Sequence, residues 1–282
     1  KRSANIICDW SKKSKVIVVL SAMSGETDRL INLTKSFSKS PNPVDFDNAI
    51  STGENLSCAL MSIYLNNQKT KSKSLHSWQI PIMTSSEHMK SRILSINKKF
   101  LLNELENLDV LVVPGFQGIN ERREITTLGR GGSDTSAVAV AAAMDAECII
   151  YTDVEGVFTT DPNIVPNAKK INKISYEEML ELASQGAKVL QTRSVELAMR
   201  KNTKLSVRSS LKPKKIGTII TDEKSVLEKN TVSGIAYTKD EAKITLSRVL
   251  DKPGVSSKIF GPLAKGNINV DMILQNLSLI HI

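Results

Sequence analysis

Cysteine and aromatic residues are scarce in this chain of 282 residues. Its three cysteines, Cys8, Cys58 and Cys148, are odd in number, widely spaced and contain no Cys-x-x-Cys pair. We therefore expect neither a disulfide framework nor a zinc site, and free thiols fit a reducing cytosol.

Long apolar runs are absent as well. The run from Val16 to Ala22 is far shorter than the roughly 20 residues that cross a bilayer, and it lacks the longer apolar region and cleavage pattern of a signal peptide. The sequence predicts a cytoplasmic protein that does not enter a membrane.

The chain has little that indicates nucleic-acid binding, although its formal net charge is +9. Aromatic residues make up only 4%, and the lysines are scattered or lie in polar stretches such as 69–73. The composition, 40% hydrophobic and 24% charged, is that of an ordinary globular protein with room for one large α/β domain and a smaller one. A positive field would favour anionic substrates.

Two phosphate-binding motifs are also missing, since no Gly-x-Gly-x-x-Gly or Walker A pattern accounts for the glycine-rich stretch from Thr126 to Ser136. This turn leads into an alanine-rich helix expected from about Thr135 to Ala146. Its backbone amides, together with the Arg130 guanidinium, form a candidate anion site, with Ser133 or Asp134 capping the helix. A tight turn capped by Ser133, with Arg130 in solvent, is the alternative.

Upstream of this turn, the sequence predicts a strand, a polar loop and a helix. The β-branched run from Lys15 to Leu20 reads as a strand buried on both faces, and Asp28 to Phe37 as a helix with Leu30, Ile31, Leu33 and Thr34 inward. Ligands of open α/β sheets lie beyond the carboxyl ends of strands, which places Ser21 and Thr27 near a substrate. A helix cap is the alternative for Thr27.

The remaining elements follow the same patterns. Buried strands are expected at 109–113 and 147–151, a polar loop at 66–77, and a hairpin tip at Arg122-Arg123. Asp45 to Tyr64 reads as one helix with a glycine, Gly53, inside it, which suggests a packing or ligand role for that glycine. Ser175 with Glu178 predicts a capping box.

Beyond residue 221 the pattern changes. Residues 222–231 are charged, without apolar periodicity, and read as a linker. After it we expect a strand at 243–246, a helix opening at 251–255 with Ile259, Phe260 and Leu263 inward, and a second strand at 269–276.

Two motifs carry a family resemblance: the stretch from Thr126 to Ser136 and the stretch from Tyr151 to Pro162. Together they resemble aspartate kinases of the amino acid kinase superfamily, and the resemblance covers nearly the whole chain. It implies an α/β fold, a three-layer αβα domain with a mainly parallel central sheet, followed by a partial ACT module (ferredoxin-like βαββαβ). The domains implied are residues 1–221 (catalytic), 222–231 (linker) and 232–282 (partial ACT).

The resemblance also implies two sets of binding residues. Glu54, in a Gly-Glu-x-x-Ser segment, would meet the amino group of the substrate, Arg130 its α-carboxylate, and Asp134 would orient the reacting groups. The substrate group comprises Ser21, Thr27, Glu54, Phe116, Arg130, Gly131 and Ser133. The nucleotide group comprises Thr152, Asp153, Gly156, Phe158, Asp161 and Lys188. Val270 and Asp271 are the residues nearest to an effector role.

The chain departs from the family pattern at several positions. Phe158 replaces a common tyrosine, Asn163 replaces an arginine that would add a phosphate contact, and Gln191-Thr192 replaces a frequent His-Pro. Nothing in 1–14 matches the Lys-Phe-Gly-Gly-Thr-Ser motif with which aspartate kinases begin, so the chain resembles one truncated at its start and within its ACT module. We expect this chain alone to be nearly inactive, and a longer product with the lysine to phosphorylate aspartate.

The implied reaction transfers the γ-phosphoryl of ATP, with Mg²⁺, to the β-carboxylate of L-aspartate, the first step toward lysine, threonine and methionine. That carboxylate has a reference pKa of about 3.9 and needs no general base. Accordingly, His76, His88 and His281 all lie outside the motifs. A lysine or threonine effector and a homo-oligomer are also implied. Two alternatives stay open: an amino acid kinase acting on glutamate, a carbamoyl group or UMP, and a non-catalytic effector-binding subunit.

Overall fold

The structure is a computed structural model that describes residues 1–79, 82–187, 189–222, 234–237, 244–246, 249, 252–266 and 270. The chain divides into two compact units, Lys1–Thr238 and Lys239–Ile282. Among the described residues, no helix is long and apolar enough to cross a membrane.

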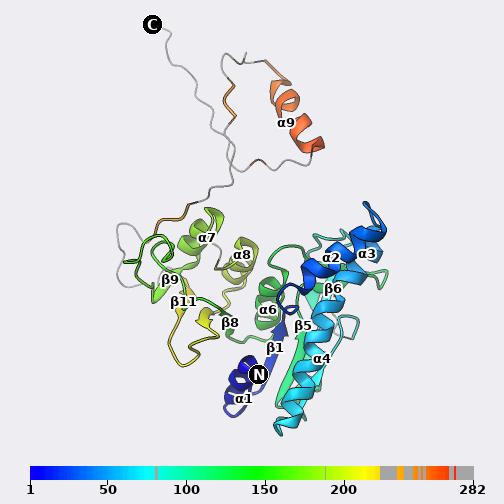
Figure 1. Ribbon diagram of the computed structural model, residues 1–282, viewed down its shortest axis with the longest axis vertical. Coiled ribbons are helices and arrows are strands. Elements are labelled where there is room, and N and C mark those ends of the chain that lie inside the picture. The colour runs from blue at the N-terminus through cyan, green and yellow to red at the C-terminus, as the bar shows by residue number, and fades with distance from the viewer. Residues whose placement is uncertain are drawn as a thin grey trace. The chain divides into compact units, whose positions relative to one another are not determined.

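The first unit contains nearly all of the described elements (Figure 1). Its helices are α1 (Arg2–Ser11), α2 (Glu26–Phe37), α3 (Pro43–Ile50), α4 (Thr52–Asn67), α5 (Lys98–Leu105), α6 (Gly132–Ala143), α7 (Tyr176–Ser184) and α8 (Thr192–Lys201). Its strands are β1 (Val16–Leu20), β2 (Ser72–Ser74), β3 (Ile82–Thr84), β4 (Ile93–Ile96), β5 (Val110–Pro114), β6 (Gln117–Ile119), β7 (Ile125–Thr127), β8 (Cys148–Thr152), β9 (Lys173–Ser175), β10 (Leu205–Ser209) and β11 (Thr218–Thr221).

A parallel sheet in the order β1-β5-β2 holds the first half of this unit together. Its middle strand is buried along its whole length, and its side chains alternate between two cores. Val110 and Val112 pack with α1 and α4, whereas Leu111 and Val113 pack with α5 and α6. Helices therefore cover both faces, which confirms the predicted three-layer α/β class; β1, predicted to be buried on both faces, is only half-buried at the edge of the sheet.

The second half is built on a sheet in the order β8-β10-β11-β9, in which only the β10–β11 pair is antiparallel. Its core faces α6, α7 and α8. On the other face, Trp10 of α1 donates a hydrogen bond to the Tyr151 hydroxyl (2.9 Å). Helix α6 contacts both β1 and β8, so it joins the two sheets (Figure 1). A third sheet, β4-β3-β6-β7, lies before α6 in the chain and contains the β6–β7 hairpin.

Several predicted elements were confirmed. The strands expected at 109–113 and 147–151 are β5 and β8, and Arg123, at the predicted hairpin tip, has a left-handed φ of 62°. The capping box is present: Glu178 N donates to Ser175 Oγ, and Ser175 N donates to Glu178 Oε2, both at 3.1 Å. This pair fixes the start of α7 because it satisfies two amides that the helix leaves free.

Other predictions were wrong. The helix expected over 45–64 is two helices, α3 and α4, that meet at Ser51, whose carbonyl accepts a hydrogen bond from the Gln117 side chain (3.0 Å). The expected loop at 66–77 contains β2, which pairs with β5, and the buried Ser72 side chain bonds to Ser62. Leu33, expected inward, is 48% exposed.

The second unit contributes α9 (Val255–Lys265), at the predicted place, with Ile259, Phe260 and Leu263 half-buried. Residues 244–246 lie outside any helix or strand, contrary to the strand expected there. Of the strand expected at 269–276 the structure describes only Val270, and of the linker expected at 222–231 only Asp222.

Candidate functional site

The carboxyl ends of β1 and β5 meet at one edge of the first sheet, where Gly115 N donates to Leu20 O (2.9 Å). Ser21 directly follows Leu20 and is exposed. A Cβ on Gly115 would lie 2.9 Å from the backbone and side chain of Ser133, so the start of α6 sits against this edge. Two members of the substrate group, Ser21 and Ser133, are thereby brought to the same place.

Glu54 comes to the same edge from the first turn of α4. Its side chain is buried, and Oε1 accepts a hydrogen bond from Ala22 N (3.2 Å). The other oxygen, Oε2, is buried without a partner, which is costly for a carboxylate. Burial raises the pKa of Glu54 to about 7, although hydrogen bonds from backbone amides, including that of Ala22, oppose the shift. A cation placed here would relieve this cost.

Gly53 allows α4 to pack closely against Ala22 and helix α2. A Cβ on it would lie 3.0 Å from Cβ of Ala22 and 3.3 Å from a methyl group of Leu30. The glycine therefore has the packing role that the sequence suggested. The alternative prediction for Thr27, a helix cap, was wrong. Thr27 lies inside α2, whose N-cap is Gly25 at a φ of 78°. Thr27 is half-buried in the first turn of that helix.

The glycine-rich turn differs from its prediction at the start of the helix. Helix α6 begins at Gly132, and Gly131, with a φ of 68°, is the N-cap. Neither Ser133 nor Asp134 caps the helix, since both lie within its first turn and the cap has no side-chain hydrogen bond. Arg130 is exposed just before the helix, where its guanidinium and the first-turn amides can approach an anion together.

Phe116 links the end of β5 to this turn. Its amide donates to Ser136 Oγ (3.1 Å), and its carbonyl accepts from Leu128 N (2.8 Å). A Cβ on Gly132 would lie 2.8 Å from the Phe116 ring, so the ring packs directly on the turn. Phe116 itself has a left-handed φ of 68°, a conformation that is unfavourable for a side chain of its size.

Asp134 lies half-buried in the first turn of α6. Burial raises the pKa of its carboxyl to about 6. The helix dipole favours a carboxylate at a helix N-terminus, whereas loss of water on burial favours the neutral acid. A positive charge placed near Asp134 or Glu54 would therefore favour the ionised form of the carboxyl group.

The nucleotide group lies at and beyond the end of β8. Thr152 Oγ1 donates to Asp153 Oδ1 (3.0 Å), and Gly156, with a φ of 148°, lies so close to Thr218 that a Cβ would come within 2.6 Å of its hydroxyl. Phe158 is half-buried, and its backbone forms an isolated antiparallel β-bridge with Lys170.

Asp161 and Lys188 complete the predicted nucleotide group. Asp161 closes a turn, accepting from Asn163 N at 2.8 Å, and so has a local structural role. Lys188 falls outside the described residues.

The segment after Lys188 returns to the glycine-rich turn. A Cβ on Gly131 would overlap the side chain of Gln191, which therefore packs on the turn. Two residues further, Arg193 donates from Nη1 to Leu128 O (2.8 Å) and from Nη2 to Ser91 O (2.6 Å). The start of α8 thus holds the turn from the side of the second sheet. The sequence alone gave no sign of this role for Arg193.

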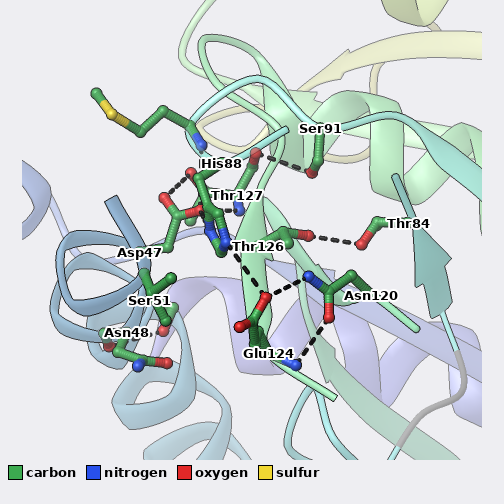
Figure 2. A network of polar contacts seen from close by, with 12 residues as sticks. Asp47, Asn48, Ser51, Thr84, His88, Ser91, Asn120, Glu124, Thr126 and Thr127 are labelled. Carbon is green, nitrogen blue, oxygen red and sulfur yellow. Dashed lines mark hydrogen bonds and ion pairs between the residues drawn. The ribbon is translucent and has the colours of Figure 1, made fainter. Parts of the chain in front are cut away.

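Sequence reasoning also missed Asp47 and His88, which form a polar network beneath the turn (Figure 2). Asp47 is fully buried on α3 and accepts from both the amide and the hydroxyl of Thr127. An aspartate inside a helical pattern gives no signal of this kind, because its partners lie far away in the chain.

The two residues predicted to be nearest to an effector role belong to the second unit. Val270 is 40% exposed. Asp271 lies outside the described residues.

Comparison with known proteins agrees with this architecture. The profile of the amino acid kinase family matches residues 1–209, and an ACT domain profile matches 247–282. The chain therefore belongs to the amino acid kinase family.

Curated relatives narrow the class to the aspartokinases. The chain is 51% identical over 265 residues to an aspartate kinase of Pseudomonas putida, covering 93% of this chain and 64% of the relative. It is 48% identical to an aspartokinase of Helicobacter pylori over 268 residues (93% and 66%). It is 41% identical to an aspartokinase of Mycolicibacterium smegmatis over 286 residues (100% and 68%). The chain thus spans about two thirds of the length of these relatives, and slightly less for the first of them.

Solved structures share the fold. An aspartate kinase from Synechocystis, 38% identical, superposes with a TM-score of 0.68 over 94% of this chain and 45% of its own. Aspartokinase III of E. coli, in a complex with aspartate and ADP, is 24% identical and superposes with a TM-score of 0.72 over 98% of this chain and 72% of its own.

Proposed function

We propose that this chain carries the substrate and nucleotide sites of an aspartate kinase, which transfers the γ-phosphoryl group of ATP to the β-carboxylate of L-aspartate and gives 4-phospho-L-aspartate. The observation that carries the proposal is the buried Glu54 oxygen without a hydrogen-bond partner, next to Ala22 at the sheet edge against which Ser133 of the glycine-rich stretch also lies. L-Aspartate offers one ammonium group and two carboxylates. Its ammonium group suits Glu54, and its α-carboxylate suits Arg130.

The remaining substrate group supports this placement. Ser21 and Ser133 lie at this sheet edge, where they and the amide of Gly131 would supply neutral hydrogen bonds, and Phe116 packs on the turn. Thr27, half-buried in the first turn of α2, would add a further contact. The β-carboxylate is already ionised at pH 7 and attacks the γ-phosphorus without a general base. The protein's task is then to hold the two anions in line and to offset their repulsion.

The nucleotide would lie at the end of β8, held by Thr152, Asp153, Gly156 and Phe158, with Asp161 shaping the following turn and Lys188 on the phosphates. Mg²⁺ would come with the triphosphate, since the described residues contain no group of three or more side chains suited to hold a metal ion. Asp134 would orient the reacting groups.

The second unit would bind an amino-acid effector, lysine or threonine, near Val270 and Asp271. Aspartokinase III of E. coli has also been solved in a complex with lysine and aspartate, which is consistent with such an effector. We further propose domain limits of 1–221, 222–231 and 232–282, a homo-oligomer and a cytoplasmic location.

The test compares L-aspartate with succinate, which lacks the amino group, as ligands of the chain and of Glu54→Gln at pH 8. Calorimetry should show aspartate binding weakened about thirtyfold by the substitution, roughly 2 kcal/mol, and succinate binding unchanged. Glu181→Gln, an exposed glutamate on α7, is the control and should alter neither. Equal losses for both ligands would show that Glu54 does not face the amino group.

Two further measurements separate the alternatives. Trapping of an acyl phosphate with hydroxylamine, with aspartate and then glutamate as substrate, distinguishes an aspartate kinase from its relatives. Binding of lysine or threonine, without binding of aspartate or ADP, would favour a non-catalytic effector subunit and refute the proposal.

A further inference from the structure

Asp47 is a buried carboxylate whose two oxygens are both occupied (Figure 2). Oδ1 accepts from the Thr127 hydroxyl (2.6 Å), and Oδ2 accepts from Thr127 N (3.0 Å) and Met89 N (3.1 Å). His88 Nδ1 lies 2.8 Å from the same oxygen. One side chain on α3 therefore fastens two other segments, the loop at 88–89 and the end of β7.

The point of attachment is the residue just before the glycine-rich turn. Thr127 ends β7, and its carbonyl is also held, by Ser91 N and Ser91 Oγ at 2.9 Å each. With its amide, hydroxyl and carbonyl all bonded, Thr127 cannot move without breaking several buried hydrogen bonds. Arg130 follows three residues later and is exposed.

His88 extends the attachment toward the hairpin. Its Nε2 lies 3.6 Å from Glu124 Oε2, and the same oxygen accepts from Asn120 Nδ2 (2.7 Å). Figure 2 shows Asp47, His88 and Glu124 in a row, with Thr127 on one side. The loop, the hairpin and the turn are thus linked through one buried carboxylate.

We propose that Asp47 is a positioning residue for the glycine-rich turn, which it holds through Thr127 so that Arg130 meets the carboxylate of the substrate. A buried charge is a poor source of stability compared with apolar packing, but it fixes the geometry of its donors closely. That is the requirement of a site in which small displacements are costly. The identity of the substrate rests on the proposed function, whereas the fixing of the turn does not.

The test uses two adjacent threonines as a matched pair. Thr126 and Thr127 are both buried, and each hydroxyl has one short hydrogen bond of 2.6 Å, to Thr84 and to Asp47 respectively. We would compare Thr127→Val and Asp47→Asn with Thr126→Val in the full 282-residue chain. Hydrogen exchange of the amides at 128–132, measured by mass spectrometry, reports on the turn, and urea unfolding reports on overall stability.

We expect faster exchange at 128–132 in Thr127→Val and Asp47→Asn than in Thr126→Val at equal overall stability. Aspartate affinity should fall about tenfold in the first two variants, with ADP affinity unchanged. Equal exchange in all three variants would overturn the proposal and leave Asp47 a purely structural residue. If the unsubstituted chain binds no aspartate, the proposed function fails, yet the exchange comparison still decides whether Asp47 positions the turn.

Discussion

Burial of Glu54 makes the stability of the protein depend on pH in an unusual direction. The pKa of its carboxyl is raised from 4.5 to about 7 in the folded chain, so the folded state holds this proton more tightly than the unfolded state. The free energy of unfolding should therefore decrease as pH rises from 4.5 to about 7 and then level off. At about 1.36 kcal/mol per pH unit, full ionisation costs about 3 kcal/mol.

The assay is urea unfolding of the unsubstituted chain and of Glu54→Gln between pH 4.5 and 8.5. Glutamine keeps an oxygen for Ala22 N, at 3.2 Å from Oε1 in the structure, but never ionises. The stability difference between the two proteins should move by about 3 kcal/mol in favour of the variant across this range, because every other titration cancels. The exposed Glu181→Gln variant should show no such change.

Asp134 contributes in the same sense over a lower range, because burial raises the pKa of its carboxyl from 3.8 to about 6. Adding Asp134→Asn to Glu54→Gln should therefore remove the pH dependence of the free energy of unfolding that remains below pH 6. A difference curve for Glu54→Gln that is flat, or that rises in the opposite direction, would show that water or a cation already compensates the buried oxygen. Glu54 would then not be a carboxylate that awaits an ammonium group.

Two further changes test the local architecture. Ser175→Ala removes the capping box of α7 and should lower the free energy of unfolding, measured in urea, by about 1 kcal/mol. Ser175→Asp should restore most of that free energy, and no loss in the alanine variant would contradict the role of the cap. Gly115→Ala places a methyl group 2.9 Å from Ser133, so the start of α6 must shift. Aspartate binding measured by calorimetry should weaken about tenfold. An unchanged affinity would mean that Ser133 can move aside without affecting the site.

Local patterns predicted the elements whose cause is local. The uninterrupted apolar run of β5 indicated a fully buried strand, and Ser175 with Glu178 indicated the start of α7. The end of the apolar run at Leu20 likewise indicated that Ser21 lies at the carboxyl edge of the sheet. These signals lie within a few residues of the feature that they specify.

Predictions failed where the deciding partner is distant in the sequence. The break between α3 and α4 depends on Gln117, which bonds to Ser51 from 66 positions away. Ser72 belongs to a strand because it pairs with Val110 of β5, 38 positions away. No periodicity within a window of a dozen residues can contain either partner, so hydrophobic pattern alone assigned one long helix and one exposed loop.

The buried carboxylates of Asp47 on α3 and Glu54 on α4 have different hydrogen-bond partners in the structure, although both lie within one predicted helix in the sequence. Asp47 has both oxygens occupied by donors, whereas Glu54 has one oxygen bonded and one without a partner. Neutralising the first should therefore destabilise the chain at pH 8, because its donors lose their acceptor, while neutralising the second should stabilise it. Opposite signs for Asp47→Asn and Glu54→Gln in one urea assay would establish that the first carboxylate completes the fold and that the second is kept for a ligand.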